Sequence, residues 1–200
     1  MLAVFTNPHS ATWATLLQRP TLDTSNLENT VQEVLQAIRQ NGDEAVRHYT
    51  SLFDKVDLAQ IAVNTAEIQT AIHTLSPALK TAIHTAAANI RRFHETQQEN
   101  TKVVETMQGV QCWRKSVGIE KVGLYIPGGT APLFSTILML GIPAQIAGCQ
   151  EVVLCRPPDK QGTIHPAILY AAHYVGIQKI FKIGGVQAIG AMTFGTQTVP

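Results

Sequence analysis

The chain has 200 residues, enough for one or two globular domains with a buried core. Its 15 Lys and Arg residues balance 14 Asp and Glu residues, and a net charge of +1 argues against a nucleic acid or an anionic membrane as partner. The three cysteines (112, 149 and 155) contain no Cys-x-x-Cys pair, so we expect neither a zinc ribbon nor a disulfide framework but a reducing, cytoplasmic compartment.

The first ten residues lack the basic and apolar regions of a secretory signal. The longest apolar stretch, residues 131–147, is interrupted by polar residues and Pro143. It is shorter than the roughly 20 residues of a membrane-spanning helix. We therefore interpret it as a buried helix.

The first hundred residues predict a mainly helical region. Apolar residues recur at helical spacing, and Asn41-Gly42, Asn64 and Ser76-Pro77 supply helix boundaries. The pattern predicts helices over residues 27–40, 44–53, 65–74 and 76–97, and a short strand over residues 61–63. The last of these helices carries an apolar stripe with its charges off the stripe, as is typical of a scaffold helix.

Residues 102–116 change to short β-rich runs on either side of Gln108-Gly109, which predicts a β-hairpin. We place a hinge here. Residues 1–120 then form a mainly helical amino-terminal region, and residues 121–200 form a second, truncated half-domain.

This second region alternates apolar strands with helices. Strands are predicted over residues 121–126, 151–155 and 178–183, and helices over 131–147, 165–175 and from 186 onward. Such an order is typical of a parallel sheet with crossover helices, buried on both faces. The fold class is therefore α/β, with a helical amino-terminal region followed by an incomplete Rossmann-like sheet in the order βαβαβα.

Glycine-rich corners follow the first and third of these strands. They read Tyr-Ile-Pro-Gly-Gly-Thr-Ala-Pro at residues 125–132 and Gly-Gly-Val-Gln-Ala-Ile at residues 184–189. Parallel strands bring both corners to one sheet edge, where free helix amides can hold an anion or a nucleotide. Neither matches G-x-G-x-x-G, so the spacing alone supports only an α/β ligand-binding half-domain.

Tyr125 and Gln187 are the candidate binding residues of these corners. Gln187 carries a donor and an acceptor within the first helical turn, and Tyr125 can stack on a ligand or hydrogen-bond to it. The alternatives are a capping or surface glutamine and a tyrosine that forms part of a wall. The residues alone slightly favour these alternatives.

Other catalytic or metal-binding motifs are not visible. The seven histidines show no i, i+4 pair and no neighbouring Cys or acidic cluster. A nucleophile elbow, a Walker loop and a catalytic Cys/His pair are likewise missing from the sequence.

The two corners and the segments around them resemble the histidinol dehydrogenase family. The resemblance is carried by residues 122–129, 131–136, 138–143, 146–149, 152–155, 168–172 and 184–189. It extends upstream to residues 42–45 (Gly-Asp-Glu-Ala), 53–55 (Phe-Asp-Lys), 89–90 (Asn-Ile) and 93–94 (Phe-His). It covers nearly all of this chain but only about the first half of a typical family member.

The resemblance implies a homodimeric, zinc-dependent oxidoreductase of histidine biosynthesis that uses NAD. Such an enzyme oxidises L-histidinol through L-histidinaldehyde to L-histidine and reduces two NAD molecules in succession. It also implies that Tyr125 and Gln187 contact the cofactor. The catalytic acid/base pair and the zinc ligands are expected beyond residue 200, so no catalytic or metal residue is assigned here and the fragment alone is expected to be inactive.

Two alternatives remain open from the sequence. The chain could be a truncated, non-catalytic paralogue that acts as a binding module. It could also belong to another NAD-dependent alcohol or aldehyde dehydrogenase with the same half-domain.

Overall fold

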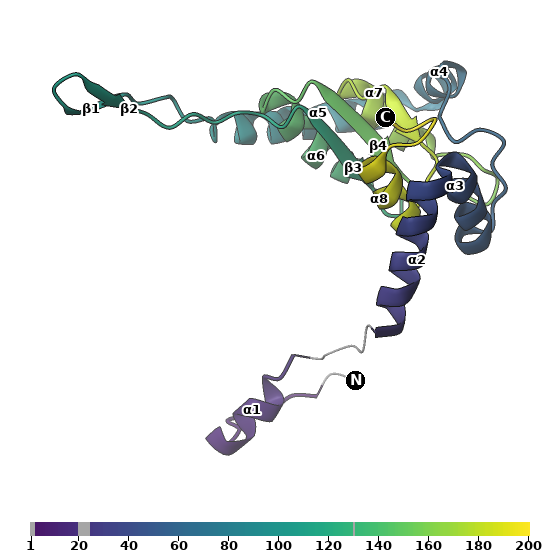
Figure 1. The fold of residues 1–200 in the computed structure, drawn as a ribbon, viewed down its shortest axis with the longest axis horizontal. Coiled ribbons are helices and arrows are strands. Elements are labelled where there is room, and N and C mark those ends of the chain that lie inside the picture. Colours follow the sequence, from purple (N-terminus) through teal and green to yellow (C-terminus); the bar gives the residue numbers. More distant parts are fainter. Residues whose placement is uncertain (1–2, 20–24, 130) are drawn as a thin grey trace.

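A computed structural model of the chain places a three-stranded parallel sheet between two groups of helices (Figure 1). The structure describes residues 3–19, 25–129 and 131–200. Thr130, in the first glycine corner, lies outside the described residues.

The amino-terminal region is helical, as predicted. It contains a 3-10 turn at Ser10–Thr12, α1 (Trp13–Leu16), α2 (Ser25–Asn41), α3 (Asp43–Tyr49), α4 (Thr65–Thr74) and α5 (Pro77–Glu95). The 3-10 turn and α1 are short segments for which the sequence carried no clear signal. The helix expected over residues 44–53 ends at Tyr49 and continues as a π-helical turn, η2 (Thr50–Asp54), which stops at Lys55 in the left-handed conformation.

Side chains at the helix starts explain several boundaries. Asn64 and Glu67 form a reciprocal capping box on α4. Ser76 accepts a hydrogen bond from the Leu79 amide at the start of α5, where Pro77 occupies the first turn. Gly42, with a φ of 55°, separates α2 from α3.

The predicted hairpin is confirmed. Strands β1 (Val104–Met107) and β2 (Val110–Cys112) pair antiparallel, with a glycine of positive φ, Gly109, in the turn. Every residue of both strands is exposed, and Figure 1 shows the hairpin projecting away from the main sheet.

The remaining chain forms the predicted βαβαβα unit. Its elements are β3 (Lys121–Tyr125), α6 (Phe134–Ile146), β4 (Glu151–Cys155), α7 (Pro166–Tyr174), β5 (Lys179–Phe181) and α8 (Gly185–Phe194). The strand order is β3-β4-β5, and both pairings are parallel. Tyr125 pairs with Cys155 and Cys155 with Phe181, so the three strands end side by side.

Alternate residues of the strands point into two separate cores. Leu124, Leu154 and Ile180 belong to a core shared with α4, α5, α6 and α7. Their neighbours Val153, Cys155 and Phe181 belong to a second core shared with α2, α3 and α8. The apolar strands are therefore covered on both faces, as their composition predicts, and helices from both halves of the chain provide the cover.

A segment from the amino-terminal region pairs with the outer edge of β5. The Val63 amide donates to the Ile180 carbonyl at 2.9 Å, and the Lys182 amide donates to the Ile61 carbonyl at 2.8 Å. The strand predicted over residues 61–63 is thus a single antiparallel bridge, Ala62 to Phe181. This pairing brings the end of η2 close to the carboxyl edge of the sheet.

None of the helices in the described ranges is both long and apolar enough to span a membrane. The apolar α6 has only 13 residues and contains Pro143. The division of the chain into two regions near residue 120 stays a prediction.

Candidate functional site

The candidate site lies at the carboxyl edge of the parallel sheet. Three loops leave this edge; their described residues are 126–129 and 131–133 after β3, 156–165 after β4 and 182–184 after β5. In open α/β sheets, ligands bind outside this edge. Tyr125 and Gln187 lie in or directly beside two of the loops.

Tyr125 links the end of β3 to the start of α8. Its hydroxyl accepts a hydrogen bond of 3.0 Å from the amide of Gly185, the first residue of the helix. One of the helix amides expected to be free is therefore satisfied by this tyrosine. Because of this bond, the phenol ring is fixed against the second glycine corner, and the structure joins the two predicted corners.

Gln187 is fully buried, which rules out its interpretation as a surface glutamine. Its Nε2 donates a hydrogen bond of 3.2 Å to Oδ2 of Asp54, at the end of η2. Its Oε1 is buried and has no hydrogen-bond partner among the described residues. An unsatisfied buried carbonyl costs about 1–3 kcal/mol, so this oxygen is suited to accept a hydrogen bond from a ligand.

Glycines let the backbone approach closely around this amide. Gly185 has a φ of 52°, and a Cβ there would lie 2.8 Å from Oε1 of Gln187. A Cβ on Gly184 would lie 2.6 Å from Cβ of Pro157, and one on Gly128 would lie 2.8 Å from Cγ of the same proline. The two glycine corners thus meet on Pro157, in the loop after β4.

Arg156, the first residue after β4, adds a positive charge to the site. It is buried, and its Nη1 donates a hydrogen bond of 3.0 Å to the Pro127 carbonyl. Burial lowers the pKa of its guanidinium, and interaction with Tyr125 opposes this shift. With Gly128, Gly129 and the residues of the β4 loop it lines a cavity of about 200 Å³. Arginine and glycine amides are groups that bind phosphate.

Sequence reasoning missed Arg156 and Asp54. Arg156 could have been found, because it directly follows a predicted strand at the edge already assigned to ligand binding. Asp54 belongs to the Phe-Asp-Lys segment that resembles the family, but its contact with Gln187 could not have been found, since the two residues are 133 positions apart and no local pattern connects them.

Asp54 and Asp43 lie in environments that shift their pKa values in opposite directions. Burial raises the pKa of Asp54 above its ordinary value, and the hydrogen bond from Gln187 offsets only part of the rise. Burial also disfavours ionised Asp43, but hydrogen bonds from Thr196 and Thr198 and the charge of Arg47 outweigh it and lower the pKa of Asp43.

These shifts predict opposite pH dependences of stability for Asp43→Asn and Asp54→Asn. The stabilising effect of Asp43 is present above its unfolded-state pKa of about 4 and is lost as the pH falls through its lower folded-state pKa. The ionised Asp54 is disfavoured by folding, so its favourable effect is present below about pH 4 and is lost as the pH rises through its higher folded-state pKa. Urea unfolding of the wild type and of each variant between about pH 3 and 7 gives the difference in free energy of unfolding at each pH. If the two differences changed with pH in the same direction, the opposite pKa shifts would be contradicted.

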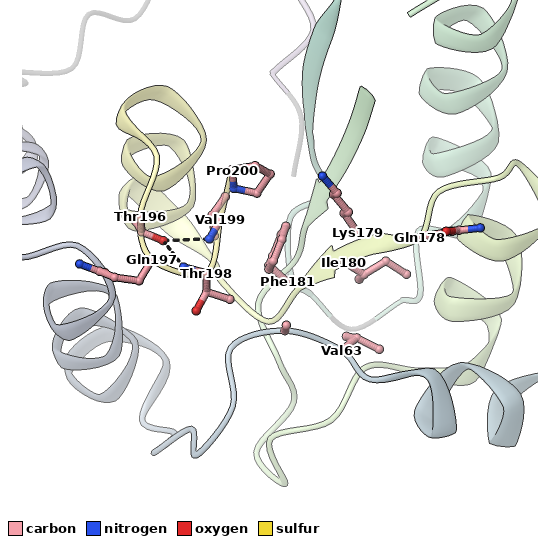
Figure 2. A pocket seen from close by; sticks show the side chains of 11 residues that line it. Val63, Gln178, Lys179, Ile180, Phe181, Thr196, Gln197, Thr198, Val199 and Pro200 are labelled. Atoms are coloured by element: carbon pink, nitrogen blue, oxygen red, sulfur yellow. Dashed lines mark hydrogen bonds between the residues drawn. The ribbon is translucent and has the colours of Figure 1, made fainter. Parts of the chain in front are cut away.

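A second cavity, of about 390 Å³, lies beside β5 and away from Tyr125 and Gln187. Its walls come from β5, from residues 62–63 and from the loop at residues 196–200. Figure 2 shows the Thr196 hydroxyl accepting hydrogen bonds from the amides of Thr198 and Val199 within that loop. Among the residues that line this cavity, only Lys179 has a charged side chain, so we do not assign a cofactor to the cavity.

The described residues contain no group of three or more His, Cys, Asp or Glu side chains that could hold a metal ion. The buried Cys155 is also a poor ligand here, because burial raises the pKa of its thiol to about 12 and disfavours the thiolate.

Comparison with known proteins identifies relatives across the whole chain. The family model for histidinol dehydrogenase matches residues 17–200. Histidinol dehydrogenase of Bacteroides thetaiotaomicron is 56% identical over 200 residues, which are 100% of this chain and 47% of that protein. Histidinol dehydrogenase of Xylella fastidiosa (strain Temecula1) is 48% identical over 193 residues, or 96% of this chain and 44% of that protein.

The fold agrees with a solved structure. The crystal structure of histidinol dehydrogenase from Elizabethkingia anophelis superposes with a TM-score of 0.91 and 52% sequence identity, covering 97% of this chain and 45% of that one. The chain thus spans just under half the length of the relatives it matches, at their amino-terminal part. It belongs to the histidinol dehydrogenase family, a family of oxidoreductases of histidine biosynthesis.

Proposed function

We propose that this chain is the NAD-binding, amino-terminal part of an NAD-dependent histidinol dehydrogenase. The complete enzyme would oxidise L-histidinol to L-histidinaldehyde, passing a hydride to one NAD and releasing a proton. Water would then add to the aldehyde, and oxidation of this hydrate would pass a second hydride to another NAD and give L-histidine with release of protons. Family membership supports the reaction. The buried Gln187 carbonyl at the sheet edge, which has no partner in the described part of the chain, supports the binding of a ligand there.

The residues at this edge suit a dinucleotide. NAD has hydroxyl and amine donors for the Gln187 carbonyl, flat rings for Tyr125 and a pyrophosphate for Arg156 and the glycine amides. The glycines of the two corners let Gln187 and Pro157 pack directly against the backbone at this edge, where a Cβ would collide with them. The bound cofactor would supply the hydride acceptor, and these protein groups would hold it in place.

Each residue has a separate task in this proposal. Tyr125, whose partly buried side chain packs against the second core and whose hydroxyl is held by the Gly185 amide, would contact the cofactor through the part of its ring that stays exposed. Gln187 would accept a hydrogen bond from the cofactor through Oε1, which is buried and has no partner among the described residues. Arg156 keeps further N–H groups beyond the one that binds the Pro127 carbonyl, and these are available to an anion.

The catalytic acid and base, the zinc ligands and most substrate contacts are proposed to lie in the part of the relatives that this chain does not match. Besides Arg156, two ionisable side chains, His165 and Asp159, line the cavity of about 200 Å³, and both are already engaged. His165 caps α7 by accepting from the Ala167 amide, and Asp159 accepts from Thr163 and the Gln161 amide. We further propose a homodimeric, cytoplasmic enzyme when the chain is complete.

Replacing Gln187 or Tyr125 by alanine is expected to weaken NAD binding. A lost hydrogen bond costs about 0.5–1.5 kcal/mol, or up to roughly tenfold in affinity, and Tyr125→Ala also loses stacking area. In the complete enzyme the KM for NAD should rise while kcat and histidinol binding change little. Calorimetric titration of the chain with NAD and steady-state kinetics measure the effect.

The matched control is Gln178→Ala, which changes an exposed glutamine next to the opposite end of β5. It should leave the affinity for NAD unchanged. An unchanged NAD affinity in both Gln187→Ala and Tyr125→Ala would return these residues to a purely structural role. A fall in kcat without a rise in KM would instead indicate a part in hydride transfer.

A further inference from the structure

We infer that Asp54 is a positioning residue for the cofactor site: its carboxylate holds the Gln187 amide so that the carbonyl oxygen faces the ligand as a hydrogen-bond acceptor. This inference rests on the proposed function, since it needs a ligand at Gln187. It extends the site to η2, which is remote in sequence from both glycine corners.

The bond between the two side chains fixes the orientation of the amide. An ionised carboxylate can only accept hydrogen bonds, so it must face the NH₂ end of Gln187. The structure has this arrangement, with Nε2 of Gln187 3.2 Å from Oδ2 of Asp54. Rotating the amide by 180° would place two oxygens against each other, and the Gln187 carbonyl is therefore kept on the side away from Asp54.

The freed carbonyl lies against the second glycine corner. Oε1 of Gln187 would be 2.8 Å from a Cβ on Gly185, and the amide of that glycine is held by Tyr125. This oxygen is buried and unpartnered within the described residues. The site therefore selects a ligand group with an O–H or N–H donor, such as a ribose hydroxyl or an amine of NAD.

The fold keeps Asp54 in this place. It ends the π-helical turn η2, and the following Lys55 adopts a φ of 59°. A Cβ on Gly184 would lie 3.2 Å from Oδ1 of Asp54, so the glycine also makes room for the carboxylate. The described residues form no ion pair with Asp54. A half-buried carboxylate without a cation is costly for the fold, which favours a role in the site.

A double-mutant cycle on NAD affinity tests this role in the 200-residue chain. Asp54→Ala and Gln187→Ala should each weaken NAD binding by up to roughly tenfold. The double variant should bind within about twofold of Gln187→Ala, because Asp54 acts only through that side chain. Asp54→Asn should recover most of the affinity lost in Asp54→Ala, since its carbonyl can still accept from Nε2 of Gln187. Asp57→Ala, at an exposed carboxylate nearby, is the control.

Additive losses, or full affinity in Asp54→Ala, would overturn the positioning role while leaving the proposed function intact. If the wild-type chain bound no NAD, the proposed function would fail. A second measurement tests the contact itself without NAD. By NMR, the side-chain NH₂ signals of Gln187 should be protected from exchange in the wild type and lose that protection in Asp54→Ala. Unprotected signals in the wild type would overturn the contact as well.

Discussion

The 200-residue chain alone is expected to form no NADH from L-histidinol and NAD. Oxidation of an alcohol needs a positioned base, which contributes about 10²–10⁴-fold in rate. In the cavity beside Arg156, His165 already caps α7 and Asp159 already accepts hydrogen bonds within its own turn, so neither is free to act as this base. The described residues also hold no cluster that could bind a metal. The rate should therefore be indistinguishable from that of a reaction without enzyme.

A chimaera should restore the activity. In it, this chain replaces the matching 47% of histidinol dehydrogenase from Bacteroides thetaiotaomicron, to which it is 56% identical. We expect NADH formation with L-histidinol and none with simple alcohols, measured by absorbance at constant NAD. The unmodified relative is the control for the assay. Circular dichroism of the chimaera shows whether it is folded. Turnover by the chain alone would show that the catalytic groups have been misplaced.

Zinc content provides an independent measurement on the same two proteins. After dialysis, the chain alone should keep no stoichiometric zinc, whereas the chimaera should keep it if the ligands lie in the other half. One zinc ion per isolated chain would contradict the absence of a ligand cluster in the described residues.

The sheet could be predicted from sequence because its signals are local. The strands are short apolar runs, and each is followed by a loop whose glycines or prolines end it. Parallel pairing follows from the alternation of strands with helices of suitable length. The limits of the elements follow less directly from local signals, and α6 begins at Phe134, three residues later than expected.

The candidate site was only partly predictable because its contacts join distant segments. Tyr125 and Gln187 could be selected, since each sits at a strand end or a helix start. Their environments depend on tertiary packing: the Tyr125 hydroxyl meets an amide 60 residues away, and Gln187 meets Asp54 across 133 residues. Local pattern slightly favoured a surface or capping role for Gln187, whereas in the fold the side chain is fully buried with its amide against Asp54 of η2.

The shared cores also determine how the chain should unfold. One core combines Ile83 of α5 and Ile68 of α4 with Leu154 and Ile180 of the sheet. Neither the amino-terminal helices nor the sheet can keep this core alone. We therefore expect one cooperative urea transition that includes both sides of residue 120, and two separate transitions would argue against this coupling.

Leu154→Ala should cause a large loss of stability within this transition. Leu154 lies in the central strand β4 and is fully buried between the sheet and its covering helices. Large-to-small changes of this kind cost about 2–5 kcal/mol, out of a total that is typically about 5–15 kcal/mol. Ile119→Ala, at a residue that is 69% exposed, should change the free energy of unfolding by less than about 0.5 kcal/mol. Linear extrapolation of urea unfolding gives both values, and similar losses in the two variants would show that β4 is not at the centre of the fold.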